Sequence, residues 1–341
     1  MKKLSLGLVG LGHMGKIHLY NCLRIKNADL VAVSDTSKTA LNFARKIGVN
    51  NVYSDYHLLL ESSEIDAVII TLPTFLHYEC AKTAAAEGKD IFLEKPLASE
   101  IGEGEEMLAY VKRNDVKMMV GYHLRFVTAF QNLKNDLESG TIGDVQMAIA
   151  TFVGSGPFYH RRRGNEPAPV PDWYFDNRLV GGALLDTGSH VVNLLRWYFG
   201  DVASAKSYVG HRFHMDFEDH VAAILKFENG TISMVNVGWF SEDMQVKVEL
   251  YGTVAHRCAG YASRTGIDFV KNAIMRKIHR KPVLPMGYEP YFTELKYFVD
   301  CVSTDTQPNP SGEEALEDLK TIFLIYKSRC ELPQDSLLST D

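Results

Sequence analysis

Apolar runs alternate with amphipathic segments through the first 120 residues of the chain. Continuous apolar runs, which predict strands, lie at Leu4–Val9, Leu30–Ser34, Ala67–Thr71, Asp90–Leu93 and Lys117–Val120. Helical spacing appears between them, at Gly15–Ile25, Ser37–Ile47, Phe75–Glu87 and Gly102–Arg113. Buried strands linked by helices are typical of a parallel sheet that is covered on both faces. The pattern predicts an N-terminal α/β domain, residues 1–120, with a doubly wound sheet.

The pattern changes after Gly121. Helices are predicted at Phe126–Ser139, Glu289–Ser303 and Gly312–Cys330. Strands that alternate apolar and polar residues are predicted at Val145–Val153, Ala205–Val209, Val221–Phe227, Thr231–Val237 and Gln245–Tyr251, with a hairpin turn at Glu228–Gly230. One better-buried face is typical of an antiparallel sheet. We therefore expect a C-terminal α+β domain, residues 121–341, with an open, largely antiparallel sheet.

Composition narrows the class of protein. Of 341 residues, 46% are apolar and 23% charged, as in soluble globular proteins. The 36 basic and 42 acidic residues give a net charge of −6, which argues against a nucleic-acid partner. No apolar run approaches the roughly 18 residues of a membrane span, and glycines interrupt the apolar start of the chain. The 5 scattered cysteines favour a reducing, cytoplasmic compartment.

The segment "GLVGLGHMG" contains a glycine motif for binding a dinucleotide. Gly10, Gly12 and Gly15 form G-x-G-x-x-G between a predicted strand and a predicted helix, which is the context that the motif requires. These glycines allow a tight turn, close approach of the backbone to a pyrophosphate, and close packing of helix on strand. His13 and Met14, within the motif, are expected to contact the cofactor as well. A glycine turn without a ligand is the alternative. The motif predicts a Rossmann domain that binds NAD(P).

Asp35 bears on the choice of cofactor. It lies 20 residues beyond Gly15, at the end of the second predicted strand. A carboxylate there accepts hydrogen bonds from the ribose hydroxyls and repels a 2′-phosphate, so NAD is favoured over NADP. Asp35 could instead cap the helix that begins near Ser37.

Lys95 follows the predicted strand Asp90–Leu93 and precedes Pro96. Ligands of open parallel sheets bind outside the carboxyl ends of the strands, so Lys95 is expected to face the cofactor. There it can hold a substrate hydroxyl and stabilise alkoxide character. A solvated lysine and an ion pair with Glu94 are equally open alternatives.

The glycine motif, Asp35 and "EKP" (Glu94–Pro96) together resemble the Gfo/Idh/MocA oxidoreductases. The similarity extends over the whole chain and includes "TLPTFLHYECAKTAAAEGKDIFLEKPLA", "GYHLRF" and "GGALLDTGSHVVNLLRWYFG". By this resemblance, Pro73 and His77 line the cofactor cleft. The expected cofactor contacts also include Thr71, Glu94, Lys95 and Arg125, although Arg125 could equally brace the two domains.

Asp186 and His190 lie four residues apart in a predicted helix after a glycine pair, so they share a face. An imidazole beside a carboxylate is suited to general acid–base chemistry, whereas the alternative is a helix-start Asp and a buried structural His. The resemblance implies that Asp186, His190 and Lys95 are the catalytic residues. Asn193 departs from the family pattern, in which many members carry an acid. Substrate contacts are expected from Lys95, Tyr122, Trp173, Asp186 and His190.

The resemblance implies an NAD-dependent enzyme that transfers a hydride between nicotinamide and a secondary alcohol or ketone of a sugar, cyclitol or sugar derivative. Three alternatives are open: redox-assisted cleavage of glycosides, a non-catalytic NAD-binding sensor, and a nucleotide-sugar dehydrogenase, for which the Arg161–Arg163 loop is the only indication. A homodimer or homotetramer is implied, because relatives bury the open sheet against another subunit. No metal site is expected, since His211, His214 and His220 fit no tight zinc spacing.

Overall fold

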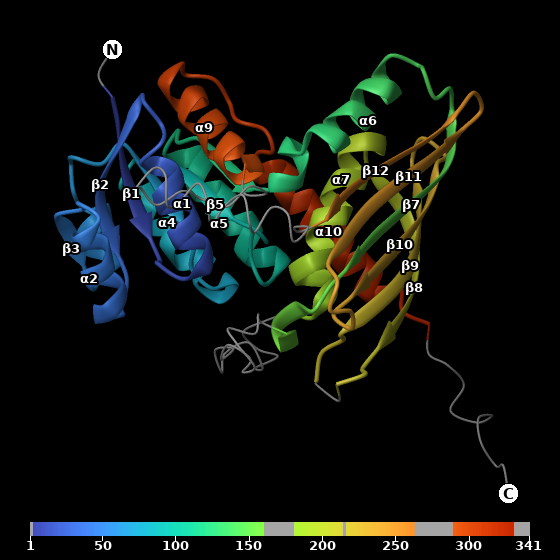
Figure 1. Cartoon of the computed structure of the whole chain (residues 1–341), viewed down its shortest axis with the longest axis horizontal. Helices are drawn as coiled ribbons and strands as arrows, with labels where there is room; N and C mark the ends of the chain where they lie inside the picture. Colours follow the sequence, from blue (N-terminus) through green and yellow to red (C-terminus); the bar gives the residue numbers. More distant parts are fainter. Residues whose placement is uncertain (1–2, 160–180, 214–215, 263–288, 331–341) are drawn as a thin grey trace, which may run out of the picture. The chain divides into compact units, whose positions relative to one another are not determined.

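The computed structural model describes residues 3–159, 181–213, 216–262 and 289–330, in two compact units (Figure 1). The first unit takes its described residues from Met1–Asn132 and Tyr261–Leu319. The second takes them from Leu133–Asn177, Gly181–Gly260 and Lys320–Asp341. The boundary predicted after residue 120 stays a prediction. That residues 289–319 pack with the first unit is a feature that local sequence patterns did not indicate.

The first unit is built on a parallel sheet of six strands in the order β3-β2-β1-β4-β5-β6. The strands are β1 (Leu4–Val9), β2 (Ala28–Ser34), β3 (Asn51–Tyr53), β4 (Ala67–Ile70), β5 (Asp90–Glu94) and β6 (Met118–Gly121). Each neighbouring pair is parallel. The predicted doubly wound sheet is therefore confirmed. The strand order reverses between β1 and β4, and open α/β sheets bind ligands at such a point.

Helices join these strands. They are α1 (His13–Cys22), α2 (Lys38–Lys46), α3 (Tyr56–Leu60), α4 (His77–Ala86) and α5 (Ile101–Arg113), with short 3₁₀ turns η1 (Thr74–Leu76) and η2 (His123–Phe126). Helix α9 (Glu289–Ser303), from the other end of the chain, packs against α1 and η2. Its buried side chains Leu295, Phe298 and Val299 join Phe92 and Met119 in one apolar core. The first unit thus depends on two distant parts of the chain.

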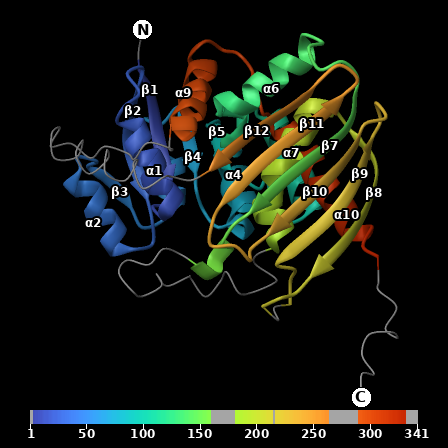
Figure 2. The same ribbon diagram turned by 45° about the vertical axis from the view of Figure 1, so that its right-hand side comes forward.

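The second unit carries a mixed sheet of six strands in the order β12-β11-β7-β10-β9-β8, which Figure 2 shows side by side. They are β7 (Val145–Val153), β8 (Val202–Gly210), β9 (His220–Phe227), β10 (Ile232–Gly238), β11 (Gln245–Gly252) and β12 (His256–Ala262). β10 pairs with β7 in parallel, whereas β8–β9, β9–β10 and β7–β11 are antiparallel. The hairpin predicted at Glu228–Gly230 is confirmed, and Gly230 has φ +93°, which glycine adopts without strain.

The two faces of the second sheet differ. Along β9 and β10 buried and exposed residues alternate, and α7 (Ser189–Phe199) packs against β7. The exposed face nevertheless carries large apolar side chains, namely Met147, Tyr208, Ile224, Ile232 and Met234. The short segments η3 (Gly156–Tyr159) and η5 (Leu184–Gly188) both lie between β7 and β8 in sequence, while α6 (Thr128–Glu138) and α10 (Gly312–Lys327) contain residues of both units.

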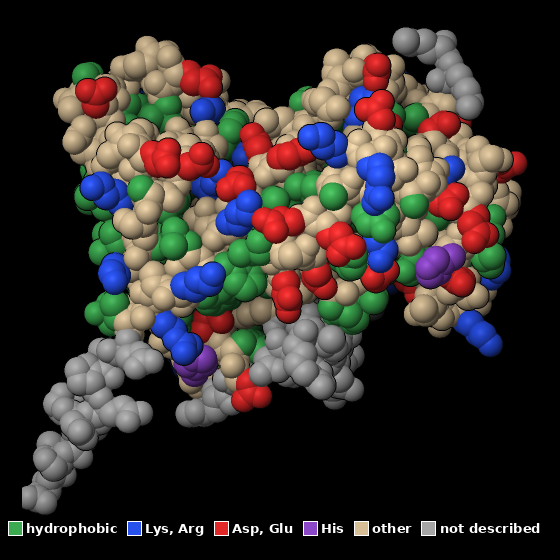
Figure 3. Space-filling model, turned by 180° about the vertical axis from the view of Figure 1, so that it is seen from behind, with side chains coloured by type: hydrophobic (Ala, Val, Ile, Leu, Met, Phe, Trp, Pro, Cys, Tyr) green, Lys and Arg blue, Asp and Glu red, His purple; other side chains and the backbone are tan. Residues whose placement is uncertain are grey.

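Among the described helices, none combines the length and the apolar character that a membrane span requires. On the face shown in Figure 3, the side chains of Lys and Arg are interspersed with those of Asp and Glu. The described part of this face therefore lacks the broad basic surface that nucleic-acid binding requires.

Candidate active site

The glycine motif forms the turn between β1 and α1. Gly10 has φ +90°, and a Cβ atom there would lie 2.8 Å from the carbonyl oxygen of Thr71. At Gly15 a Cβ atom would lie 2.1 Å from the carbonyl oxygen of Gly10. The Thr71 hydroxyl donates a hydrogen bond of 2.9 Å to that carbonyl. Both positions therefore require glycine, and Thr71 at the end of β4 fixes the turn.

Gly12, which precedes the first residue of α1, has different surroundings. It is exposed, and a Cβ atom added there would meet no atom within 4 Å. The free N–H groups and the dipole of a helix N-terminus favour an anion. His13 is exposed and Met14 is half-buried beside it. The turn thus offers open space at a helix N-terminus, as a bound pyrophosphate requires.

Asp35 links the glycine turn to the following helix. Its carboxylate accepts a hydrogen bond of 2.6 Å from the backbone N–H of Leu11 and one of 2.7 Å from that of Ser37. The Ser37 hydroxyl accepts from the N–H of Ala40 and caps α2. Asp35 therefore does organise the start of α2, as the alternative interpretation had it. The half-buried carboxylate also lies beside the glycine turn, and its contact with a ribose stays a prediction.

His77 joins the loop after β4 to the loop after β5. Its Nδ1 lies 2.8 Å from the carbonyl oxygen of Pro96, and its Nε2 lies 2.9 Å from that of Leu72. Burial lowers the pKa of His77, and the hydrogen bonds with the two carbonyls oppose this shift. The ring is fully buried, so it positions both loops. Its predicted contact with the cofactor stays a prediction, as does that of half-buried Pro73.

Lys95 follows β5 and is half-buried. The preceding side chain, Glu94, is turned to α1, where its Oε1 lies 2.7 Å from Nε2 of His18. Neither partner of this buried pair is well exposed, since the side chains are 0% and 8% accessible. The sequence analysis placed Glu94 at the cofactor and did not identify His18. The Glu94–His18 hydrogen bond anchors the residue next to Lys95.

His123 lies close enough to Lys95 for the lysine charge to affect it. Burial, and then the positive charge of Lys95, lower the pKa of His123 to about 3, so it is neutral at pH 7. Its ring stacks on Tyr291 of α9 with a centroid distance of 4.1 Å. Tyr122, the residue before His123, is buried as well. The stacked rings of His123 and Tyr291 therefore lie near Lys95, which follows β5.

Arg125 has a bracing role within the first unit. Its guanidinium donates hydrogen bonds of 2.7 Å each to Asn309 Oδ1 and Glu314 Oε2. Arg125 is buried, whereas Glu314 is partly exposed. Both partners belong to the first unit. These bonds join distant parts of one unit, so both the predicted brace between the two domains and the predicted cofactor contact of Arg125 stay predictions.

Asp186 and His190 lie in consecutive helical segments of the second unit. Residues Leu184–Gly188 form a π-helix, and α7 begins at Ser189. The predicted helix is therefore present, but its first turn is wider than an α-turn. Such π-bulges are frequent at functional sites. Asp186 is half-buried, and His190 is buried against the Phe152 ring at a centroid distance of 5.8 Å.

Glu218, which is not among the predicted site residues, fixes the start of this helix. Its Oε1 accepts hydrogen bonds of 2.9 Å from the N–H of Leu184 and of 2.9 Å from the hydroxyl of Tyr326. A Cβ atom at Gly182 would lie 2.1 Å from the other carboxylate oxygen. The glycine pair is thus needed for the close approach of Glu218, and Glu218 positions the segment that carries Asp186.

Of the remaining candidate residues, some form hydrogen bonds in a turn and others lie outside the described residues. His211 Nδ1 lies 3.0 Å from the Phe217 carbonyl, and His220 Nδ1 lies 2.6 Å from Asp219, so both stabilise a turn. His214, Trp173 and Arg161–Arg163 lie outside the described residues. Lys95 belongs to the first unit, and Asp186 and His190 belong to the second. The convergence of these three residues on one substrate stays a prediction.

Comparisons with known proteins agree with a Rossmann domain that is followed by a second domain. The family model of the oxidoreductase family with an NAD-binding Rossmann fold, GFO_IDH_MocA, matches residues 4–122, and the GFO/IDH/MocA C-terminal domain matches residues 130–256. Myo-inositol 2-dehydrogenase of Thermotoga maritima is 28% identical over 95% of this chain and 96% of its own. D-xylose 1-dehydrogenase [NADP(+)] of Haloarcula marismortui is 26% identical over 89% and 81%.

A solved structure has a similar fold and covers most of this chain. The crystal structure of a probable dehydrogenase from Thermotoga maritima superposes with a TM-score of 0.80 and 26% identity, and covers 95% of this chain and 96% of that one. Two family models that together span most of the chain, and relatives that match most of its length, agree with the glycine turn and the parallel sheet. The chain belongs to the Gfo/Idh/MocA family of oxidoreductases.

Proposed function

We propose that the protein is an NAD-dependent dehydrogenase that transfers a hydride between nicotinamide and a secondary alcohol or ketone of a sugar, cyclitol or sugar derivative. The observation that supports this proposal most directly is the open space at the exposed Gly12, at the N-terminus of α1. Asp35 accepts a hydrogen bond from the neighbouring turn. These residues fit a dinucleotide, which supplies the hydride acceptor or donor. Relatives named for myo-inositol and xylose support the substrate class.

Each proposed catalytic residue has one role. The ammonium of Lys95 holds the substrate oxygen and stabilises its developing negative charge. The imidazole of His190 removes the hydroxyl proton during oxidation and returns it during reduction. Asp186 orients this imidazole or binds a neighbouring hydroxyl. The hydrogen bonds of Glu94 and Glu218 hold the two segments that carry these groups.

The preference for NAD over NADP rests on Asp35. In the dinucleotide complex, its carboxylate would accept hydrogen bonds from the ribose hydroxyls and repel a 2′-phosphate. The relative that uses NADP(+) shows that the family includes both specificities, so the cofactor of this chain has to be measured. The test is the ratio of kcat/KM for NAD to that for NADP with one substrate. A ratio below one would refute the assignment.

A substrate screen tests the reaction itself. Sugars, inositols, nucleotide sugars and glycosides are incubated with oxidised cofactor, and the absorbance of reduced nicotinamide is followed. We expect turnover with at least one free polyol. Tight NAD binding without turnover on any substrate would favour the sensor, and release of an aglycone without net reduction would favour glycoside cleavage. Either result would contradict the proposed dehydrogenase.

We also propose that a second copy of the chain covers the exposed face of the second sheet. Ile232 lies opposite Met147, and Met234 lies opposite Ile224, so their side chains form an apolar surface across three strands. Apolar surfaces of this kind mark interaction sites. The resemblance to oligomeric relatives supports a homodimer or homotetramer, and sedimentation measures it. The cytoplasmic location likewise stays a prediction.

A further inference from the structure

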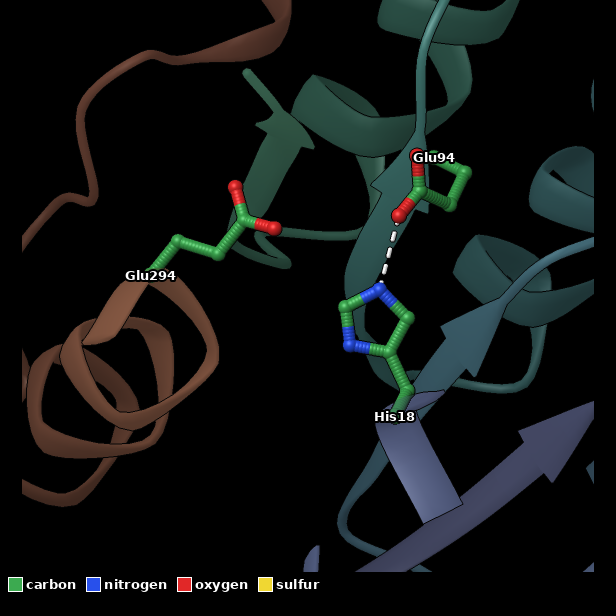
Figure 4. Close-up of side chains that lie close together, drawn as sticks. All are labelled: His18, Glu94 and Glu294. Carbon is green, nitrogen blue, oxygen red and sulfur yellow. Dashed lines mark hydrogen bonds and ion pairs between the residues drawn. The ribbon is translucent and has the colours of Figure 1, made fainter. Parts of the chain in front are cut away.

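Three buried titratable side chains from separate elements meet in the first unit (Figure 4). His18 comes from α1, Glu94 from the end of β5 and Glu294 from α9. One polar atom of each lies within 4.8 Å of the other two. Figure 4 shows the Glu294 carboxylate directed from α9 toward the His18–Glu94 hydrogen bond. The family resemblance and the proposed reaction assign no role to His18 or to Glu294.

Glu294 is the unusual member of the cluster. It is 0% exposed, and neither of its carboxylate oxygens has a hydrogen-bond partner. A buried carboxylate that remains ionised without a partner is destabilised by several kcal/mol, so such a group takes up a proton instead. Burial, and then the negative charge of Glu94, raise the pKa of Glu294 well above its ordinary value. Geometry and electrostatics therefore agree on the neutral acid.

A metal ion is a less suitable occupant. His18 Nε2 and Glu94 Oε1 are 2.7 Å apart, the distance of a hydrogen bond that an ion would have to break. His18 Nδ1 has no hydrogen-bond partner, whereas a metal-bound histidine almost always donates its second nitrogen to one. Phe92 and Tyr291 pack around the same ring at centroid distances of 5.1 and 6.4 Å. Protons satisfy these groups better than a cation does.

We propose that Glu294 is a neutral carboxylic acid at physiological pH and that, with the His18–Glu94 pair, it forms a proton-holding cluster beside the backbone of Lys95. The O–H of Glu294 then faces the Glu94 carboxylate as its acceptor, either directly after a side-chain rotation or through one bridging water. His18 donates to the same carboxylate. The cluster then contains one ionised carboxylate, that of Glu94, in place of two.

The consequence for catalysis rests on the proposed function at Lys95. Glu94 and Lys95 are adjacent in the chain. A second negative charge, on Glu294, would repel the Glu94 carboxylate and disturb the hydrogen bond with His18 that anchors this segment. Further titratable groups near the cluster, among the described residues, are Lys95, whose charge acts on His123, His123 itself, which is neutral at pH 7, and Tyr291, whose ring contacts those of His123 and His18. Glu294 is therefore a positioning residue, and its loss of a proton would lower turnover at alkaline pH.

Infrared spectroscopy on the full chain tests the proton without any substrate. Wild type minus Glu294→Gln, at neutral pH, should show the carbonyl band of a protonated carboxylic acid that shifts in D₂O. The matched control is Glu289→Gln in the same helix, because Glu289 is 64% exposed and paired with Arg24, and it should remove only carboxylate bands. Absence of the carbonyl band would overturn the proposal.

Two further measurements keep the result interpretable. Metal analysis of the purified protein should find less than about 0.1 divalent ion per chain; one ion per chain that Glu294→Gln loses would overturn the neutral acid. If the variant does not fold, ¹³C-labelled glutamate in the wild type reports the same carboxyl by its chemical shift. Once a substrate is known, the alkaline fall in kcat should disappear in Glu294→Gln and persist in Glu289→Gln. Failure of the substrate screen would leave the infrared result standing.

Discussion

The neutral form of Glu294 makes the stability of the first unit depend on pH. Burial and the charge of Glu94 raise the pKa of this carboxyl in the folded state, whereas the unfolded chain has an ordinary value of about 4.3. Above that pH the folded protein therefore binds a proton that the unfolded chain has released. Stability from this group is fully present below about pH 4.3 and falls as pH rises toward the folded pKa.

The size of this pH effect on the free energy of unfolding follows from the binding of one proton. The free energy of unfolding changes by at most about 1.4 kcal/mol per pH unit for each proton that only the folded state binds. Between about pH 5 and about pH 7, wild type should thus lose at most about 2.7 kcal/mol relative to Glu294→Gln, whose amide does not titrate. The steady loss across this range is what a neutral Glu294 requires.

Urea unfolding followed by far-ultraviolet circular dichroism measures this difference. Wild type, Glu294→Gln and Glu289→Gln are compared at three pH values and at one protein concentration, since association also affects stability. Glu289→Gln should parallel wild type because its carboxylate is exposed. Parallel curves for wild type and Glu294→Gln would refute the reasoning, and a difference of opposite sign would mean that the folded state stabilises the ionised form.

Four further predictions concern the proposed site and the sheet. Lys95→Ala should retain NAD binding and lose at least about 100-fold in kcat, whereas the exposed Lys46→Ala should not; an unchanged rate would remove Lys95 from the mechanism. Asp35→Ser should raise kcat/KM for NADP relative to NAD, and Asp35→Glu should not, as measured with one substrate. Glu218→Leu leaves a buried donor and a partly buried donor without an acceptor and should cost about 2–4 kcal/mol in urea unfolding, more than Glu218→Gln; equal losses would contradict its role. Ile224→Lys should produce smaller species in sedimentation than Ile224→Val does, and an identical distribution would place the interface elsewhere.

Strands and helices with strong periodicity were predictable because local burial determines their pattern. β1, β5 and β7 lie where the continuous or alternating apolar residues placed them. β3 was missed because it has three residues, none fully buried, and it pairs only with the edge of β2. β12, with the sequence HRCAGYA, has no clear alternation and was missed as well. Short or irregular strands depend on their neighbours in space more than on their own residues.

The candidate site was predictable where a backbone requirement leaves a mark in the sequence. Gly10 and Gly15 are such positions, because the structure leaves no room for a Cβ atom at either. The supporting residues carry no such mark. The helical spacing of apolar residues in α9 predicts a helix but does not predict the burial of Glu294. No residue near His18 in the sequence indicates that its hydrogen-bond partner lies on β5. A buried hydrogen bond between distant segments becomes visible only when the fold has brought them together.

The two glutamates that support the proposed catalytic segments illustrate this limit. Glu218 and Glu294 are both buried acids, and burial raises the pKa of each. At Glu218, hydrogen bonds from Leu184 and Tyr326 oppose the shift, so the carboxylate is stabilised as an acceptor. At Glu294 no hydrogen bond opposes it, and the nearby Glu94 charge adds to it. An identical Glu→Gln substitution should therefore weaken an acceptor at position 218 and reproduce the native neutral group at position 294, so the pH dependence of unfolding separates two residues that the sequence presents alike.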